Sequence, residues 1–294
     1  MKHRKLFRLK LNSRTLLLGE RTLVMGVLNV TPDSFSDGGK FLEPELAVEQ
    51  AFAMANAGAD LLDVGGESTR PGSKQISAAE ELDRILPVLE ALRGRLKIPI
   101  SVDTRRAAVA ELALHANAEI INDISGLQHD PKIAGVASRQ CAALILMHIR
   151  GEPRTMQAGP FARDVVKDVM QGLRRSVAVA RKAGVARSQM VLDPGIGFGK
   201  SFAQNYELLQ RLPQLARLGY PLLVGTSRKG FLGATWARNG KPAPPEERLW
   251  GTAATVTASI LNGAHIVRVH DVREMVEVAR VADCLRDPKR RPSN

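Results

Sequence analysis

Polar side chains of the kinds that bind ligands come at the ends of several short apolar segments. Asp103 closes such a segment, Asn122 and Asp193 lie in the second half of two others, and Lys229 follows a fourth. Carboxylate and amide oxygens accept hydrogen bonds from rings rich in N–H groups, such as an aminopyrimidinone, and a lysine donates to a ring carbonyl or ring nitrogen. Because burying such groups without partners costs free energy, their recurrence predicts a polar ligand.

Two basic side chains lie in the last apolar segment. Arg268 and His270 are two residues apart, and such residues point to the same face of an extended strand. A cationic pair at a strand end suits phosphate or pyrophosphate. The sequence therefore predicts an anion site beside the acceptor-rich one.

Three other polar residues in these segments have a simpler structural interpretation. Asp63 and Asp123 are expected to hold loops by hydrogen bonds, so both are left out of the predicted site. His148 is interpreted as a hydrogen-bonded histidine of the core.

The apolar segments recur at intervals of roughly 20–45 residues and lack strict polar alternation, which is typical of parallel strands buried on both faces. They are Val24–Val30, Asp60–Gly66, Ile98–Asp103, Glu119–Ser125, Ala143–Ile149, Met190–Ile196, Pro221–Ser227 and His265–Asp271. Helical stretches follow them, among them Glu45–Ala57, Ala78–Leu92 and Asp271–Leu285. Ser77 and Glu80 have the spacing of a capping box.

Eight βα units predict an α/β fold, a (β/α)8 TIM barrel rather than an open Rossmann sheet. We expect one domain over residues 1–294, with its core at about 24–286. The alternating segment Leu6–Gly19 predicts a short N-terminal β-hairpin that covers the bottom of the barrel. Because TIM-barrel active sites lie at the carboxyl ends of the strands, the polar residues there are expected to converge on one ligand.

Composition excludes several classes of protein. The net charge of +12 comes from basic residues spread along the chain without stacking aromatics, which argues against a nucleic-acid partner. Cys141 and Cys284 have no disulfide-framework or metal spacing, so reduced thiols in a cytoplasmic protein are expected. No apolar run reaches the ~18–20 residues of a membrane span, and the basic N-terminus lacks the apolar region of a signal peptide.

A glycine-rich segment, Gly197-Phe198-Gly199-Lys200-Ser201, resembles the end of a phosphate-binding P-loop. The first P-loop glycine would fall at Pro194, and the glycine spacing also misses the dinucleotide fingerprint. We interpret the segment as a flexible lid after the sixth strand.

Eight blocks of the sequence resemble dihydropteroate synthases, from Val24 to Ala279. The blocks are MGVLNVTPDSFSDGGKF (Met25–Phe41), DVGGESTRPGS (Asp63–Ser73), SVDT (Ser101–Thr104), INDISG (Ile121–Gly126), LMH (Leu146–His148), LDPGIGFGK (Leu192–Lys200), LLVGTSRKGFLG (Leu222–Gly233) and HIVRVHD (His265–Asp271). The resemblance implies joining of 6-hydroxymethyl-7,8-dihydropterin pyrophosphate to p-aminobenzoate, with loss of pyrophosphate, in folate biosynthesis.

The resemblance also implies residue roles. The residues implied for the pterin are Asp103, Asn122, Met147, Asp193, Lys229 and Arg268; those for pyrophosphate are Asn29, Arg70, Arg268 and His270; those for p-aminobenzoate are Phe35, Thr69, Pro71, Phe198, Ser227 and Lys229. Asp103, Asp193, Lys229, Arg268 and His270 would serve catalysis, and Asn29 would help bind Mg²⁺ on the pyrophosphate. A homodimer is implied as well.

The family mechanism implies that pyrophosphate leaves, a pterin-stabilised cation forms, and the p-aminobenzoate amine attacks it. Such a reaction needs positioning and charge stabilisation more than a nucleophilic side chain. The loops Thr31–Phe41 and Glu67–Lys74 are expected to close over the site.

Two alternatives stay open at the level of sequence. A methyltransferase acting on methyl-tetrahydrofolate would share the acceptor-rich pocket, but it would need neither STRPGS nor the SRK block. A basic RNA-associated protein would not need polar residues at one end of every strand. RNA binding at physiological salt would separate the second alternative from an enzyme.

Overall fold

The structure is a computed structural model of the 294-residue chain. It describes residues 4–31, 43–68, 75–152 and 155–289. None of the helices in these ranges is long and apolar enough to cross a membrane.

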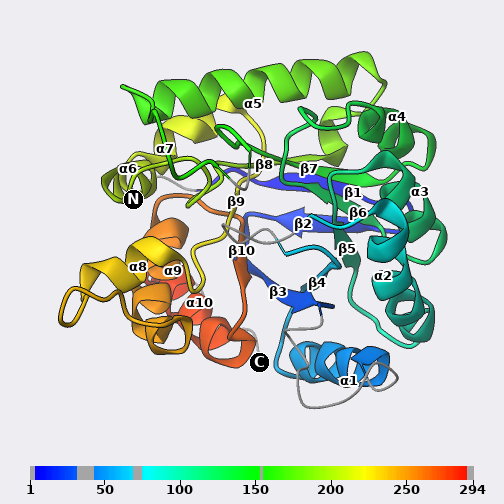
Figure 1. Ribbon diagram of the computed structural model, residues 1–294, viewed down its shortest axis with the longest axis horizontal. Coiled ribbons are helices and arrows are strands. Elements are labelled where there is room, and N and C mark those ends of the chain that lie inside the picture. The colour runs from blue at the N-terminus through cyan, green and yellow to red at the C-terminus, as the bar shows by residue number, and fades with distance from the viewer. Residues whose placement is uncertain (1–3, 32–42, 69–74, 153–154, 290–294) are drawn as a thin grey trace.

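Parallel strands form a barrel at the centre of the described chain (Figure 1). The strands are β3 (Leu23–Asn29), β4 (Leu61–Gly65), β5 (Ile100–Asp103), β6 (Ile120–Asp123), β7 (Ala143–Met147), β8 (Met190–Asp193), β9 (Leu223–Val224) and β10 (Ile266–Val269). Their order in the sheet is β8-β7-β6-β5-β4-β3-β10-β9. A parallel bridge between Leu192 and Leu222 brings β8 beside β9, so the sheet nearly closes on itself. The predicted TIM barrel is confirmed.

Helices surround the barrel and pack their apolar faces on the outer side of the strands (Figure 1). They are α1 (Glu43–Asn56), α2 (Ala78–Leu92), α3 (Ala107–His115), α4 (Lys132–Arg139), α5 (Val165–Lys182), α6 (Phe202–Gln210), α7 (Leu212–Leu215), α8 (Gly230–Thr235), α9 (Leu249–Leu261) and α10 (Val272–Arg286), with short 3₁₀ turns η2 (Arg187–Gln189), η3 (Ala216–Leu218) and η4 (Pro245–Arg248). Ser77 caps α2 by accepting the backbone N–H of Glu80, whereas the Glu80 carboxylate pairs with Arg84. Only one bond of the predicted capping box is therefore formed there.

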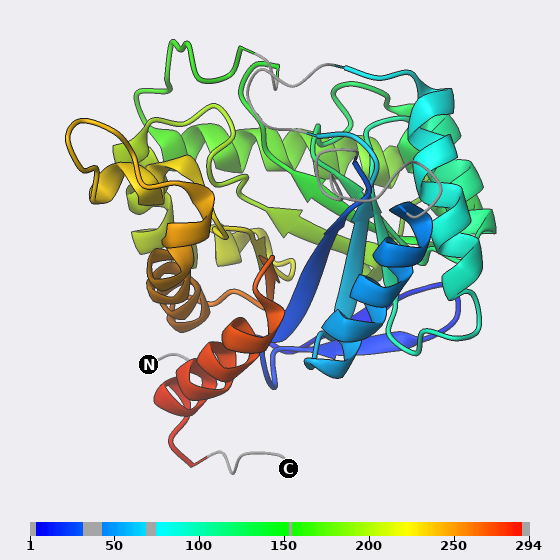
Figure 2. The ribbon, with the colours of Figure 1, turned by 60° about the horizontal axis from the view of Figure 1, so that its bottom comes forward.

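The predicted N-terminal hairpin closes one end of the barrel. Strands β1 (Phe7–Lys10) and β2 (Thr15–Leu18) pair in antiparallel fashion, and Figure 2 shows them across the lower end of β3 and β4. Leu9 and Leu18 pack in one buried cluster with residues from the start of the barrel strands. Because apolar side chains of the described residues fill this end, we expect a ligand to bind at the carboxyl ends of the strands.

Candidate active site

The inward face of the barrel changes from apolar to polar along several strands. The apolar residues, packed on the hairpin, are Leu61, Ile120, Val191 and Ile266, and the residues two positions later are Asp63, Asn122, Asp193 and Arg268. Residues two apart on a strand point to the same face. The strand period therefore delivers acceptors and cations to one layer, just above the apolar plug.

Arg268 links three strands in this layer. Its Nε donates to Asp63 Oδ2 at 2.6 Å, and its Nη2 donates to Asp103 Oδ2 at 2.9 Å. Asn122 Nδ2 donates to the same Asp63 oxygen at 2.9 Å. The expectation that Asp63 merely holds a loop is wrong: its fully buried carboxylate orients both Arg268 and Asn122.

Asp123 and His148 behave as the sequence indicated. Asp123 accepts hydrogen bonds from Ser125 and Leu127 and so holds the turn after β6. His148 is buried in the core and bonded to Lys200, and burial lowers its pKa to about 2. The His148 imidazole is therefore neutral.

Burial sets the charge state of the two carboxylates that face the ligand layer. It raises the pKa of Asp103 to about 7, although Arg268 acts in the opposite direction. It raises the pKa of Asp193 to about 6, even though the N–H of Gly195 donates to Asp193 Oδ1 at 2.7 Å and stabilises the ionised form. Both carboxyl groups therefore titrate near neutral pH, and hydrogen bonds from ring N–H groups would favour their ionised form.

Lys229 joins this layer to an apolar wall. Burial, together with Arg268, lowers its pKa to about 8. Lys229 Nζ lies 4.0 Å from the centre of the Phe198 ring. Phe198 packs with Met147 in a small buried cluster that also contains Ile124. The site thus places a flat apolar face next to a cationic donor.

Ser227 and His270 form a pair at the end of β9 and β10. Ser227 Oγ lies 2.9 Å from His270 Nδ1 and accepts the backbone N–H of His270 at 3.1 Å. Burial, with Arg268 nearby, lowers the pKa of His270 to about 3. The expected cationic pair is therefore corrected: Arg268 is the cation, and His270 is a neutral imidazole that can offer a ring N–H.

Some predicted site residues are not placed. Phe35, Thr69, Arg70 and Pro71 lie outside the described residues, as do most of the two loops expected to close over the site. Asn29 is described at the carboxyl end of β3, with its side chain half-buried. Its Oδ1 faces Gly65, the equivalent position on β4.

The interpretation of residues 197–201 as a flexible lid is corrected. Phe198, Gly199 and Lys200 are buried, with Lys200 only 2% exposed, and Gly197 and Ser201 are partly buried. Gly195, Gly197 and Gly199 all have positive φ, and a Cβ at Gly195 would lie 1.9 Å from the carbonyl oxygen of His148. The segment is a tightly packed turn that forms part of the wall of the site.

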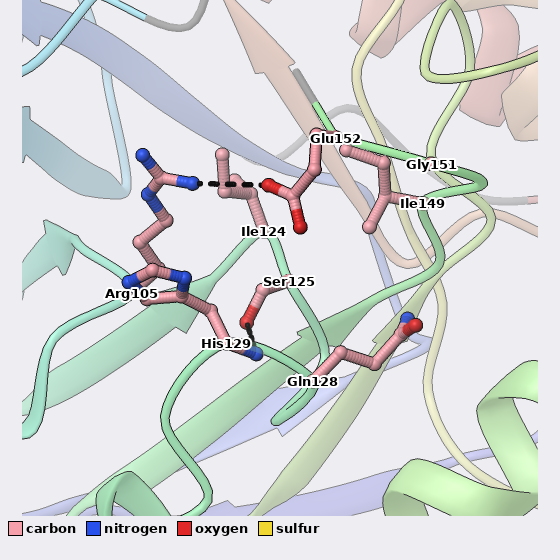
Figure 3. A pocket seen from close by; sticks show the side chains of 8 residues that line it. All are labelled: Arg105, Ile124, Ser125, Gln128, His129, Ile149, Gly151 and Glu152. Atoms are coloured by element: carbon pink, nitrogen blue, oxygen red, sulfur yellow. Dashed lines mark hydrogen bonds and ion pairs between the residues drawn. The ribbon is translucent and has the colours of Figure 1, made fainter. Parts of the chain in front are cut away.

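A small cavity lies beside this layer rather than within it. It is lined by Arg105, Ile124, Ser125, Gln128, His129, Ile149, Gly151 and Glu152 (Figure 3). Its volume of about 30 Å³ is far below the roughly 300–1,000 Å³ of small-molecule sites. Arg105 and Glu152 form an ion pair of 3.6 Å across it (Figure 3). The cavity shares the Ile124 wall with the site but does not accommodate a ring.

The fold and this layer define a class: a TIM-barrel enzyme that holds a nitrogen-rich ring and an anion at the carboxyl ends of its strands. Residues 25–270 match the family model described as pterin binding enzyme. A dihydropteroate synthase from Synechocystis sp. is 51% identical over 267 residues, which cover 91% of this chain and 91% of the relative.

Solved structures agree with this similarity. The dihydropteroate synthase of Yersinia pestis with a sulfonamide drug complex has a TM-score of 0.88 and 43% identity, covering 96% of this chain and 100% of that one. The Xanthomonas albilineans dihydropteroate synthase with 4-aminobenzoic acid has a TM-score of 0.88 and 40% identity, covering 96% and 99%. The chain belongs to the dihydropteroate synthase family of pterin-binding enzymes.

Proposed function

We propose that this protein joins 6-hydroxymethyl-7,8-dihydropterin pyrophosphate to p-aminobenzoate, giving 7,8-dihydropteroate and pyrophosphate. The observation that carries the proposal is the layer of Asp103, Asn122, Asp193 and Arg268, with Lys229 lying against Phe198. The test is pyrophosphate release with product formation when both substrates are mixed with the protein. Release that does not depend on p-aminobenzoate, or no release at all, would contradict it.

In this proposal the polar layer binds the pterin ring. Asp193 and Asp103 accept ring N–H groups, Asn122 completes the edge, and Lys229 donates to the ring. Met147 packs on one face of the ring and Arg268 stacks over it. The carboxylates also stabilise positive charge that develops on the pterin methylene when its bond to the pyrophosphate oxygen breaks.

The second substrate lies on the other side of Lys229. Phe198 and Ser227 are assigned to p-aminobenzoate, together with Phe35, Thr69 and Pro71. The amine attacks the methylene carbon, a C–N bond forms, and the nitrogen then loses a proton. The described residues need only align the two reactants, which accounts for much of the rate in such reactions. Sulfonamides are expected to compete with p-aminobenzoate here, since a related enzyme binds one.

Mg²⁺ fits the oxygen chemistry of Asn29 at the pyrophosphate. The described residues contain no cluster of three or more His, Cys, Asp or Glu that could hold a metal by themselves. Mg²⁺ is often held by one or two protein oxygens together with substrate phosphates and water, and it would neutralise charge on the leaving group. Arg268, Arg70 and a neutral His270 would contact the same anion.

The anion is expected to raise the affinity for p-aminobenzoate. In the sequence, Asn29 precedes the loop that carries Phe35, and Arg70 lies between Thr69 and Pro71, so anion binding would prepare the second site. A coupling of about 1–3 kcal/mol corresponds to roughly 5- to 150-fold tighter binding. Calorimetric titration of p-aminobenzoate with and without Mg²⁺–pyrophosphate measures it. Equal affinities would mean that the second site is preformed.

Pterin binding is also expected to depend on pH. Because Asp103 and Asp193 have pKa values raised to about 7 and about 6, protonation competes with ring N–H donation as the pH falls. The dissociation constant of hydroxymethylpterin should rise about 10-fold or more from pH 8 to pH 5.5. Asp103→Asn should flatten the upper part of this profile. An unchanged dissociation constant across the range would mean that neither carboxylate accepts a hydrogen bond from a ring N–H group.

The methyltransferase alternative is not favoured, since the related proteins and structures described above are dihydropteroate synthases. We further propose a single-domain, cytoplasmic enzyme that acts without nucleic acid and forms a homodimer. Exposed apolar side chains on the neighbouring helices α9 and α10 support the dimer: Trp250 is 78% exposed, and Val281 is 61% exposed. Analytical ultracentrifugation should then give twice the 31.9 kDa chain mass.

A further inference from the structure

Lys200 occupies the lysine position of the P-loop-like segment, but its amine does not face a ligand. The side chain is 2% exposed. Its Nζ donates to the carbonyl oxygen of Phe198 at 2.8 Å and to the carbonyl oxygen of His148 at 3.1 Å, and it lies 3.0 Å from His148 Nδ1. An ammonium has three N–H donors. Burial lowers the pKa of this amine to about 7, so the ammonium form prevails below neutral pH. In that form all three donors are satisfied inside the protein, and none is left for a phosphate.

His148 is held in the form that this contact requires. Burial lowers the pKa of its imidazole to about 2, so the ring is neutral and keeps an acceptor nitrogen. With Nδ1 accepting from Lys200, the ring hydrogen is on Nε2, 3.6 Å from Asp168 Oδ2. Arg150 holds Asp168 from the other side at 3.2 Å. Lys200 thus ends a polar chain that reaches the helix α5.

The same amine connects the two apolar residues assigned to the substrates. His148 follows Met147 directly at the end of β7, and Phe198 supplies one of the three acceptors. Around Phe198 the chain turns through Gly195, Gly197 and Gly199, all in the left-handed region that glycine favours. The glycines add no side-chain packing of their own, so the turn is held by the buried Ile196 and Phe198 side chains and by hydrogen bonds, among them that of Gly197 N–H to Asn205 Oδ1 at 2.6 Å. Without the lysine, the carbonyls of Phe198 and His148 would lose the donor that joins this part of the turn to the residue after β7.

We propose that Lys200 is a positioning residue that fixes the Phe198 ring beside Lys229 and so sets the affinity for p-aminobenzoate without touching either substrate. The inference rests on the proposed function, because that function assigns Phe198 to p-aminobenzoate. The hydrogen bonds of the pterin layer join Asp63, Asp103 and Arg268 and do not involve Lys200, whose charge only lowers the pKa of Asp193. Loss of Lys200 should therefore affect the two substrates unequally.

The experiment compares Lys200→Met, which removes the donors, with Lys200→Gln, which keeps N–H groups. Lys200→Met should raise the KM for p-aminobenzoate about 10-fold, as expected when hydrogen bonds from a charged group are lost. The KM of Lys200→Gln for p-aminobenzoate should lie between those of Lys200→Met and the wild type. The calorimetric affinity for hydroxymethylpterin should stay within about 2-fold in both.

Gln189→Met is the matched control. Gln189 is also a buried polar anchor on the β8 side of the barrel, where its Nε2 donates to the carbonyl oxygen of Ala142 at 2.9 Å. It lies at the opposite end of the strand from the site, so its loss should lower stability and leave the KM for p-aminobenzoate unchanged. A double-mutant cycle with Phe198→Ala adds a second readout: once the ring is gone, Lys200→Met should raise this KM no further.

An unchanged KM in folded Lys200→Met, or an equal loss of affinity for both substrates, would overturn the inference. Should Lys200→Met not fold, the same comparison is made with Lys200→Gln. If the wild-type protein itself makes no dihydropteroate, the proposed function fails instead. If the wild type is active and the Lys200 variants have its KM for p-aminobenzoate, the inference about Lys200 fails and the proposed function stands.

Discussion

Asp193→Asn is expected to weaken pterin binding roughly 10- to 150-fold, because it removes a charged acceptor of ring N–H groups. Hydrogen bonds to charged groups contribute about 1.5–3 kcal/mol each. The asparagine can still accept the N–H of Gly195, which now donates to the aspartate at 2.7 Å, so the turn after β8 should survive. Calorimetric titration with hydroxymethylpterin at pH 8 measures the loss.

The same substitution is expected to stabilise the protein when no substrate is bound. The folded-state pKa of Asp193 is raised from 3.8 to about 6 by burial. A group with a raised folded-state pKa contributes stability that is fully present below its unfolded pKa and lost as the pH rises through the folded pKa. At pH 8 the ionised carboxylate therefore lowers the free energy of unfolding, on the order of 2–3 kcal/mol.

Urea unfolding at pH 8 and at pH 5 tests this trade-off. Asp193→Asn should be more stable than the wild type at pH 8, by about 1–2 kcal/mol once weakened attraction to Lys229 is included, and the gain should shrink at pH 5. Asp60→Asn is the control, since Asp60 pairs with Arg21 at the other end of the barrel. Retained pterin affinity in folded Asp193→Asn, or no stability gain at pH 8, would refute this account.

The barrel and most of the ligand layer could be predicted because both follow from local periodicity. Asn122, Asp193 and Arg268 each come two residues after an apolar residue that packs on the hairpin. Residues two apart on a strand point to the same face, so the polar residue and the apolar one both face inward. Asp63 follows Leu61 in the same way. The spacing after Leu61 therefore indicated that Asp63 faces inward. The same spacing is compatible with an aspartate that only holds a loop, and the two cases are distinguished only by the position of Arg268.

Two other features depend on tertiary packing and have no local signal. Lys200 is buried because the carbonyls of His148, just after β7, and of Phe198, in its own turn, both accept from its amine, whereas the glycine spacing alone favoured an exposed lid. The neutral state of His270 results from burial near Arg268, which two-residue spacing cannot reveal. Sequence periodicity thus predicts which side chains face the site, whereas the burial of Lys200 and the neutral state of His270 depend on tertiary packing.

Arg268→Ala is expected to cause the largest loss of stability among the site variants. Arg268 is the counter-ion of Asp63, which is fully buried, and of Asp103. Removing one partner of a buried pair leaves uncompensated charge and costs about 3–5 kcal/mol. Because Arg268 lowers the pKa of Asp103, its removal should raise that pKa further. The loss should therefore be greater at pH 8 than at pH 5.5, where Asp103 can be protonated.

A second substitution separates the structural from the ligand-binding role of Arg268. Asp63→Asn in the Arg268→Ala background removes the orphaned charge and should restore part of the free energy of unfolding, measured in urea at pH 8. Pyrophosphate binding should not return, because the cation is still missing. Equal stability of the single and double variants would show that the Asp63 pair is not the source of the loss.

The ligand-binding role of Arg268 depends on the guanidinium N–H groups that do not bond to Asp63 or Asp103. Nε and Nη2 of Arg268 are engaged by Asp63 and Asp103, whereas Nη1 has no hydrogen-bond partner among the described residues. That arrangement fixes the guanidinium while leaving N–H groups for an anion. The double variant should therefore lose more affinity for the pyrophosphate-bearing pterin than for the pterin alcohol, when both are titrated at pH 8 with Mg²⁺. Equal losses for the two ligands would mean that Arg268 only stacks on the ring, and the anion would then be bound by other groups.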